Sequence, residues 1–157
     1  MTRQHIRFSA LQSIFWGTLL LFLDFDLNFR FGFSFTVPLL PDCLGFWLVG
    51  RGTRALAADR PSLGLLAPFW LALGLWSLQQ FFPSLSPHIP GALSLLAALV
   101  RMYADFQLFT DLAGLAEDLL PGTPLPRQLR AARTAAVLLT TLFYFQDLLL
   151  RAPWLTV

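Results

Sequence analysis

Five long apolar stretches, separated by proline-rich breaks, most constrain what this chain can fold into. A helix needs about 20 mostly apolar residues to cross the roughly 30 Å hydrocarbon core of a membrane. Stretches of this kind cover residues of about 8–28, 38–57, 62–82, 90–119 and 130–151. We therefore predict an all-α integral membrane protein in which residues 1–157 form a single domain, a bundle of five transmembrane helices.

Charged residues are too few to cover the surface of a soluble domain of this size. They make up 13% of the 157 residues, whereas hydrophobic residues make up 56%. Soluble domains carry about 25% charged residues. The net charge of +2 is also too small for a nucleic-acid-binding protein. These numbers exclude a soluble globule and a disordered chain. We expect the lipid bilayer as the main partner, with other membrane proteins or a second copy of the chain as further candidates.

The distribution of arginines predicts the orientation, because cytoplasmic loops carry an excess of positive charge. If the N-terminus is cytoplasmic, eight of the eleven arginines are cytoplasmic: Arg3, Arg7, Arg51, Arg54, Arg60, Arg127, Arg130 and Arg133. Arg30 and Arg151 then lie outside, and Arg101 lies within the fourth span. The pattern predicts an N-in/C-out, multi-pass protein of the plasma (inner) membrane. No small-residue cleavage site follows the basic N-terminus, so we expect a retained first span rather than a signal peptide.

The second span, at about 38–57, is the weakest of the five. Prolines and Asp42 interrupt its beginning, and proline and acidic residues both suit the first turn of a helix. We expect Pro41 and Asp42 to open this helix. Apolar and small residues alternate over 31–37, which favours an extended segment. A re-entrant hairpin is the alternative, but it would reverse the later topology and disturb the arginine pattern.

A short motif at the head of this span resembles a group of uncharacterised small bacterial membrane proteins, best known from Gram-positive bacteria. Their second span begins with a motif similar to Leu-Pro-Asp-Phe-Ile-Gly-Tyr. The matching positions here are Leu40, Pro41, Asp42, Gly45 and Phe46, whereas Cys43 and Leu44 replace the usual Phe-Ile. The likeness covers about residues 19–52. It implies a multi-pass membrane fold and no particular activity.

Polar and charged residues at membrane depth are the candidate functional residues, because they are costly there. The cluster consists of Asp24, Asp26, Asn28, Asp42, Arg101, Asp105 and Asp147. If the first helix extends to residue 28, Asp24 and Asn28 share one of its faces. Carboxylates in the outer leaflet would suit a hard cation or a proton path. Alternatively, they cap helix ends at the polar interface, with Asp42 at a helix N-terminus and Asp147 paired with Arg151.

Arg101 is the most distinctive of these residues, because it lies near the middle of the fourth span. An arginine there costs about 2.5–3.5 kcal/mol on insertion scales. Asp105 lies one helical turn away and is the expected ion-pair partner. Five guanidinium donors call for a second acceptor, for which Asp24 and Asp26 are the candidates. Helix packing and binding of a solute both remain open for Arg101. Further along the same span, we expect Asp111, Glu117 and Asp118 to form a solvated cytoplasmic face, offset by the arginines at 127, 130 and 133.

The sequence contains no catalytic motif. It has no metalloprotease motif, nucleophile elbow, phosphate loop or dinucleotide fingerprint. Cys43 is the single cysteine, and His5 and His88 fall on opposite sides of the membrane. We therefore expect a protein that is not an enzyme and that has no cofactor and no metal site. The favoured function is a non-enzymatic accessory or structural membrane subunit. The alternative is a small solute or cation transporter or channel, lined by the outer carboxylates and Arg101.

Overall fold

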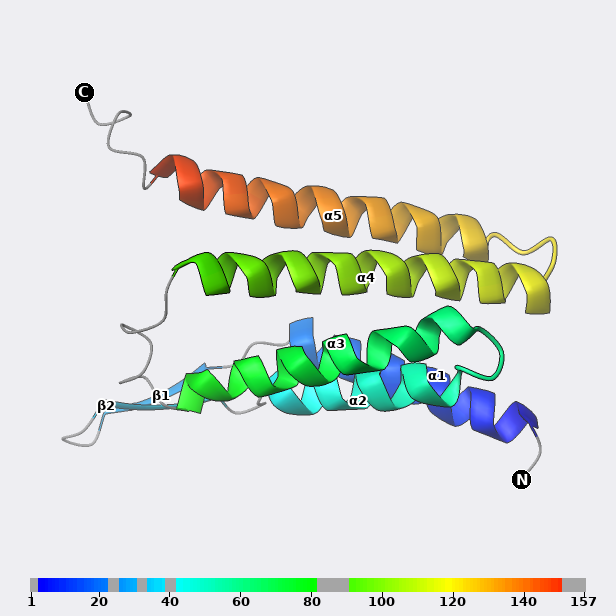
Figure 1. The fold of residues 1–157 in the computed structure, drawn as a ribbon, viewed down its shortest axis with the longest axis horizontal. Helices are drawn as coiled ribbons and strands as arrows, with labels where there is room; N and C mark the ends of the chain where they lie inside the picture. Colours follow the sequence, from blue (N-terminus) through cyan, green and yellow to red (C-terminus); the bar gives the residue numbers. More distant parts are fainter. Residues whose placement is uncertain (1–2, 23–25, 31–33, 39–41, 82–90, 151–157) are drawn as a thin grey trace. The chain divides into compact units, whose positions relative to one another are not determined.

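In the computed structural model, the described residues form five α-helices, one 3-10 helix and one β-hairpin (Figure 1). The structure describes residues 3–22, 26–30, 34–38, 42–81 and 91–150. The helices are α1 (Arg3–Phe22), α2 (Asp42–Ala55), α3 (Pro61–Ser77), α4 (Gly91–Leu119) and α5 (Leu125–Leu150). The hairpin pairs β1 (Asp26–Arg30) with β2 (Ser34–Pro38), and a 3-10 helix, η1 (Leu78–Phe81), continues α3. This confirms the predicted all-α fold with five helices, to which the hairpin adds one small sheet.

The chain divides into two compact units, Met1–Ala104 and Asp105–Val157. The division falls within α4. The first unit contains α1, the hairpin, α2, α3, η1 and the first half of α4. The second unit contains the rest of α4 together with α5.

Helix α4 is the one described helix that is long and apolar enough by itself to cross a membrane. Its 29 residues coincide closely with the predicted span at 90–119. Helix α3 is apolar but shorter, with 17 residues. Helix α2 has 14 residues and begins at Asp42, as expected from the Pro41-Asp42 pair, so it covers less than the predicted 38–57 span.

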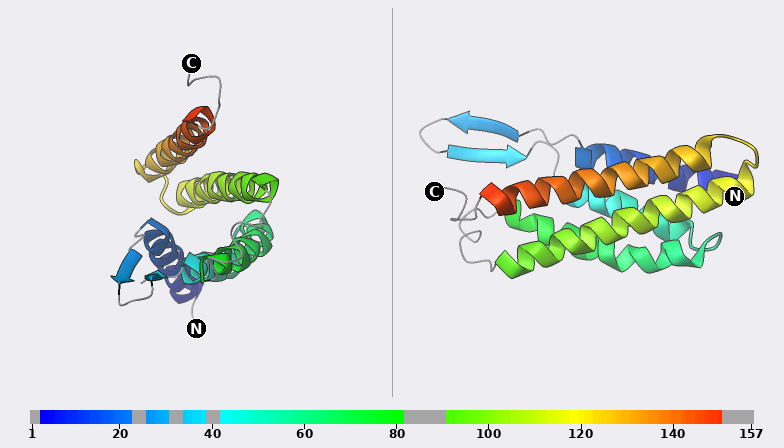
Figure 2. Two further views of the ribbon diagram at one scale, coloured as in Figure 1. Left: turned by 90° about the vertical axis from the view of Figure 1, so that its left-hand side faces the viewer. Right: turned by 90° about the horizontal axis from the view of Figure 1, so that it is seen from above.

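The first helix differs from the prediction at both ends. Helix α1 begins at Arg3 and ends at Phe22, short of the predicted end at residue 28. The chain then forms β1 and β2, which pair antiparallel with Phe29 opposite Phe35 (Figure 2). Asp and Asn favour turns and caps over helix interiors, and alternating Phe residues suit a strand. Of the extended segment expected at 31–37, residues 34–37 lie in β2 and residues 31–33 lie outside the described residues. Asn28 lies in β1 instead of in a helix.

Glycines bring α1 and α2 into close contact. A Cβ atom added to Gly17 would lie 2.7 Å from the carbonyl oxygen of Gly45 and 2.9 Å from the amide nitrogen of Val49. One added to Gly52 would lie 2.7 Å from the carbonyl oxygen of Ala10. These neighbours are backbone atoms, which cannot move aside separately. Small residues thus allow the two helices to approach at backbone distance, as in membrane helix pairs.

Aromatic side chains fill the contact between α2 and α3. The rings of Phe46 and Trp70 stack with their centroids 6.1 Å apart. The two side chains are buried, with 3% and 1% of their surface exposed. A Cβ atom on Gly50 would meet the Cβ atom of Trp70 at 3.2 Å, so small and large residues interlock here. This contact forms the core of the first unit, with Leu56, Leu63 and Leu66 also buried.

An ion pair joins the start of α1 to the turn between α2 and α3. The Arg7 guanidinium donates two hydrogen bonds to Asp59, from Nε to Oδ2 at 2.9 Å and from Nη2 to Oδ1 at 2.5 Å. Both side chains are partly buried. The hydrogen bonds from Arg7 hold the pKa of the Asp59 carboxyl below its ordinary value of 3.8, and Asp59 raises the pKa of Arg7. The bidentate geometry fixes the start of α1 against the turn between α2 and α3.

This ion pair predicts an acid-sensitive contribution to stability. Because the pKa of Asp59 is lowered by folding, the contribution is present above its ordinary value of 3.8 and is lost as pH falls through the lower folded value. Arg7 stays charged over this range. In thermal unfolding measurements, Asp59→Asn should lower the melting temperature at neutral pH. The difference from the natural chain should disappear well below pH 3.8; a difference that persists there would contradict the ion pair.

In the second unit, α4 and α5 are joined by a tight turn. Gly122 has a φ of 84°, a left-handed conformation that suits glycine. Beyond the turn, Arg130 donates a hydrogen bond from Nη2 to Oε2 of Glu117. Both side chains are exposed. This pairing agrees with the expectation that the arginines at the start of α5 offset the acids at the end of α4.

Candidate functional site

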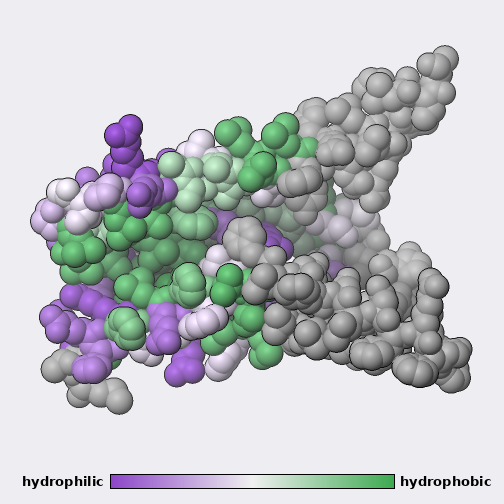
Figure 3. All heavy atoms as spheres, turned by 180° about the vertical axis from the view of Figure 1, so that it is seen from behind, coloured by the Kyte–Doolittle hydropathy of each residue, from purple (hydrophilic) through white to green (hydrophobic). Residues whose placement is uncertain are grey.

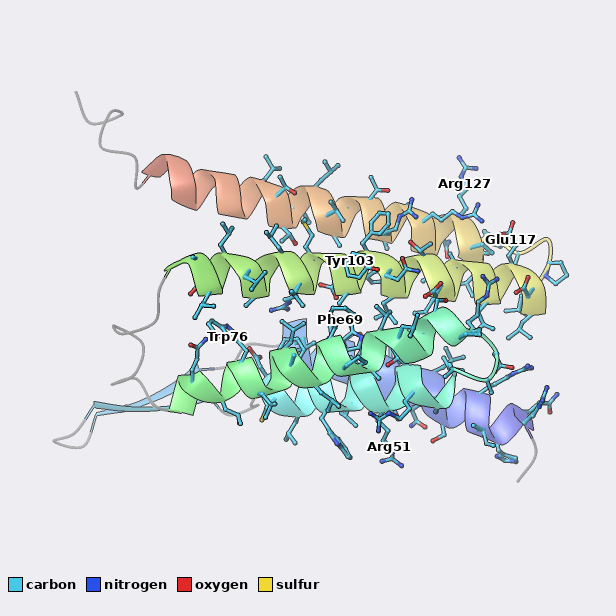
Figure 4. The ribbon with its side chains drawn as sticks, viewed as in Figure 1. Arg51, Phe69, Trp76, Tyr103, Glu117 and Arg127 are labelled. Atoms are coloured by element: carbon cyan, nitrogen blue, oxygen red, sulfur yellow. The ribbon has the colours of Figure 1, made fainter. Side chains whose placement is uncertain are left out.

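Arg101 packs on an aromatic ring of a neighbouring helix. Its guanidinium carbon lies 5.5 Å from the ring centroid of Phe46 on α2. The Phe46 ring in turn stacks on Trp70 of α3. Nearby, Phe69 of α3 and Tyr103 of α4 meet edge to face, with their ring centroids 5.9 Å apart (Figure 4). A guanidinium over an aromatic face contributes roughly 0.5–2 kcal/mol, depending on its desolvation. Arg101 thus contacts α2 within the first unit.

The other predicted site residues are spread over several elements. Asp42 lies half-buried in the first turn of α2, where it suits the helix dipole. Asp105 lies half-buried one turn after Arg101 on α4, and the proposed pair between them stays a prediction. Asp24 lies outside the described residues. The backbones of Asp26 and Asn28 lie in β1 and that of Asp147 in α5, and the structure does not describe these three side chains.

A second polar cluster, which the sequence analysis missed, lies on α4 and α5 in the second unit. Asp111 is buried, with 5% of its surface exposed, and accepts a hydrogen bond from Gln107 Nε2 at 3.2 Å. Arg133 of α5 donates from Nη1 to Oγ1 of Thr110 at 3.1 Å. The Arg133 guanidinium carbon also lies 4.6 Å from the ring centroid of Phe106. We call these five residues the α4–α5 cluster.

The burial of Asp111 in this cluster corrects the expectation that Asp111, Glu117 and Asp118 form a solvated cytoplasmic face. Glu117 and Asp118 are exposed as expected, but Asp111 is buried. Helix α5 begins at Leu125, earlier than the predicted 130, so Arg133 lies in the third turn of a helix. The Leu125-Pro126 pair indicates this earlier start in the sequence, because proline is favoured in the first turn of a helix. Because α5 begins at Leu125, Arg133 lies within the helix and contacts Thr110 and Phe106 of α4.

Two buried nitrogen atoms have no hydrogen-bond acceptor among the described residues: Trp70 Nε1 and Arg133 Nε. Each belongs to a side chain that otherwise packs on aromatic rings, Trp70 on Phe46 and Arg133 on Phe106. Within the described part of the chain, no three His, Cys, Asp or Glu side chains come close enough to share a metal ion. The described residues therefore supply ring-packing and hydrogen-bond contacts between helices.

The contacts of the α4–α5 cluster predict that replacing two arginines of α5 will lower the free energy of unfolding by different amounts. Arg133→Ala removes a hydrogen bond from a charged donor and a cation–π contact, and should lower the free energy of unfolding by about 2 kcal/mol. Arg127→Ala is the matched control, because Arg127 is exposed and points away from α4 (Figure 4). Unfolding in mixed micelles measures both. Equal losses for the two variants would show that the contacts of Arg133 contribute nothing.

In comparisons with known proteins, the chain matches no protein-family model. It also matches no curated protein and no solved structure at a significant level. The resemblance of residues 19–52 to small bacterial membrane proteins therefore stays a prediction.

Proposed function

We propose that the chain is a multi-pass protein of the plasma membrane whose five helices all lie in the bilayer, with the N-terminus in the cytoplasm and the C-terminus outside. Exposed apolar side chains support this. Only 17% of the most apolar part of α4 is buried, whereas the core helix of a soluble protein is mostly buried. Figure 3 shows apolar residues (green) on the surface of one face and hydrophilic residues (purple) mainly toward its left end.

Large apolar side chains are exposed on every helix. They include Phe8, Phe15 and Trp16 on α1, Leu44 and Trp47 on α2, Leu65, Leu71 and Leu75 on α3, Leu93, Leu95, Leu96 and Leu99 on α4, and Leu138, Leu139 and Leu142 on α5. Soluble monomers rarely expose contiguous apolar patches larger than a few hundred Å². In a bilayer these side chains face lipid. Helix α2 is short for a span, whereas α3 is continued by η1.

Within this membrane, the favoured role is that of a non-enzymatic structural or accessory subunit. The observation that carries it is that charged side chains of α4 and α5 pack against the neighbouring helix of their own unit. Arg101 lies on Phe46 of α2, and Arg133 lies on Phe106 and Thr110 of α4. Such contacts hold helices together. Partner proteins or a second copy would then bind through the exposed apolar faces.

The topology is tested with the single cysteine. Cys43 lies half-buried at the start of α2, which the proposed orientation places on the outer side. A membrane-impermeant maleimide applied to intact cells should label it, and carbonate washing should leave the protein in the membrane. Labelling only after permeabilisation would overturn the orientation. Release by carbonate would overturn membrane integration itself.

The structural role is tested by a double-mutant cycle on α4. If Asp105 is the ion-pair partner that holds Arg101 in place against Phe46 of α2, Arg101→Leu and Asp105→Leu should each destabilise the protein. The double variant should recover about 1 kcal/mol of the summed loss. Arg127→Leu is the control for the loss of a positive charge.

The transporter alternative predicts a different result at the same position. Arg101→Cys in a Cys43→Ser background would then react with a water-soluble thiol reagent, because the residue would line an aqueous path. Under the structural role, the introduced cysteine should resist that reagent. Reaction from the outside, together with additive losses in the double-mutant cycle, would replace the structural role by transport.

A further inference from the structure

A groove lies between α1 and α2 near the start of α1. Its volume is about 390 Å³, within the range that holds small-molecule ligands. Its walls include His5, Ser9 and Ser13 from α1 and Arg51 from α2. The floor is the close approach of the two helices at Gly52, so the groove depends on the absence of a side chain there.

The groove lining contains one positively charged residue, Arg51, and no acidic residue. The Arg51 guanidinium carbon lies 5.6 Å from the ring centroid of Trp47, and both side chains are exposed. Asp59, in the turn after α2, is bound by Arg7. Arg3 and Arg54 are also exposed on these two helices. The Ser13 hydroxyl donates its hydrogen to the Ser9 carbonyl oxygen at 2.9 Å. The lining thus offers a guanidinium, an imidazole and the Ser9 hydroxyl to an anion, and phosphate is an anion that arginine binds well.

Apolar groups adjoin the charged ones. Ile6 lines the groove and is 43% exposed, and Ala10 and Ala55 also line it. The ring of Trp47, beside the Arg51 guanidinium, adds further exposed apolar surface on α2. A ligand that satisfies both surfaces has an anionic head and an apolar tail. This combination favours a lipid over a free phosphate ion.

We propose that this groove binds the head group of an anionic phospholipid from the cytoplasmic leaflet, with Arg51 and His5 at the phosphate. The proposal rests on the membrane topology proposed above, which places the start of α1 and the end of α2 on the cytoplasmic side. Basic pockets between helices on this side are suited to acidic head groups. The acyl chains would then extend past Ile6.

Lipid binding is measured on the full chain in nanodiscs by native mass spectrometry and by the phospholipid retained after detergent extraction. Phosphatidylglycerol should be retained in preference to phosphatidylcholine. Arg51→Gln should weaken that retention about fivefold, as loss of one cationic contact near an anionic surface predicts. Arg54→Gln is the matched control: it lies three residues away on the same helix, carries the same charge and is not among the groove-lining residues.

Each result separates the possibilities. A loss in Arg51→Gln with little change in Arg54→Gln supports the groove. Equal losses would show diffuse attraction to the surface, and no loss in either would show that the groove is not used; both overturn the proposal. Displacement of the lipid by excess inorganic phosphate would identify a phosphate-ion site instead. Incorporation into neutral nanodiscs, together with carbonate resistance, tests membrane integration independently, so the proposed groove can fail while the proposed topology stands.

Discussion

Gly17→Leu is expected to lower the free energy of unfolding by about 3 kcal/mol, because overpacking at a closed interface typically costs 1–3 kcal/mol and occasionally more. Even the first carbon of the new side chain would lie 2.7 Å from a backbone oxygen of α2 and 2.9 Å from a backbone nitrogen. Neither atom belongs to a side chain that can rotate away. The helices α1 and α2 must therefore separate, which also removes the contacts of their neighbours.

The matched control is Gly91→Leu. Gly91 is the first residue of α4, and no atom lies within 4 Å of the Cβ atom it would gain. Leucine is a better helix former than glycine by roughly 0.5–1 kcal/mol, so this variant should be neutral or slightly more stable. Reversible unfolding in mixed micelles gives both values. Similar stabilities for the two variants would show that α1 and α2 are not in close contact.

Trp70→Ala is expected to cost about 3 kcal/mol. Removal of a large aromatic side chain from a core typically costs 3–5 kcal/mol. Part of that cost is the free energy of transferring the side chain out of water, and this part is smaller for a protein in a bilayer. The cost of the cavity and of the lost dispersion contacts is still present there. Trp70 has 1% of its surface exposed and stacks on Phe46, which in turn lies under Arg101. The same substitution should therefore also alter the environment of Arg101.

Trp16→Ala provides the comparison, because Trp16 is 49% exposed on α1. Its removal leaves no enclosed cavity, and the loss should stay below about 1 kcal/mol. Tryptophan fluorescence and unfolding of the two variants can be compared directly. If Trp16→Ala costs as much as Trp70→Ala, the core of the first unit does not lie between α2 and α3.

Local signals explain the parts of the fold that could be predicted. Helix α4 was predicted within one residue because Pro90 and Pro121 bracket a continuous apolar run. Asp42 was recognised as a helix start because proline and an acid adjoin there. The end of α1 was misplaced, because hydropathy does not distinguish an apolar helix from a Phe-rich strand.

The two polar sites depend on contacts between distant residues, which no short motif reveals. The groove joins His5 to Arg51, 46 residues further along the chain. Arg133 meets Thr110 across the α4–α5 turn. The sequence suggested a role for Arg101, since a charge inside an apolar run is conspicuous. The contact between Arg101 and Phe46 could not be predicted, because it depends on how α2 and α4 are placed within the first unit.

The unequal lengths of α2 and α4 have a consequence for the surrounding lipid. At 1.5 Å per residue, 14 residues span roughly 21 Å and 29 residues roughly 44 Å. A bilayer with a hydrocarbon core of about 30 Å matches neither helix. In the proposed membrane setting, α4 would tilt while the lipid beside α2 thins, at a cost of fractions of a kcal/mol per Å of mismatch. Bilayer thickness would then regulate the stability of this protein, and reconstitution in lipids of increasing chain length should reveal an optimum.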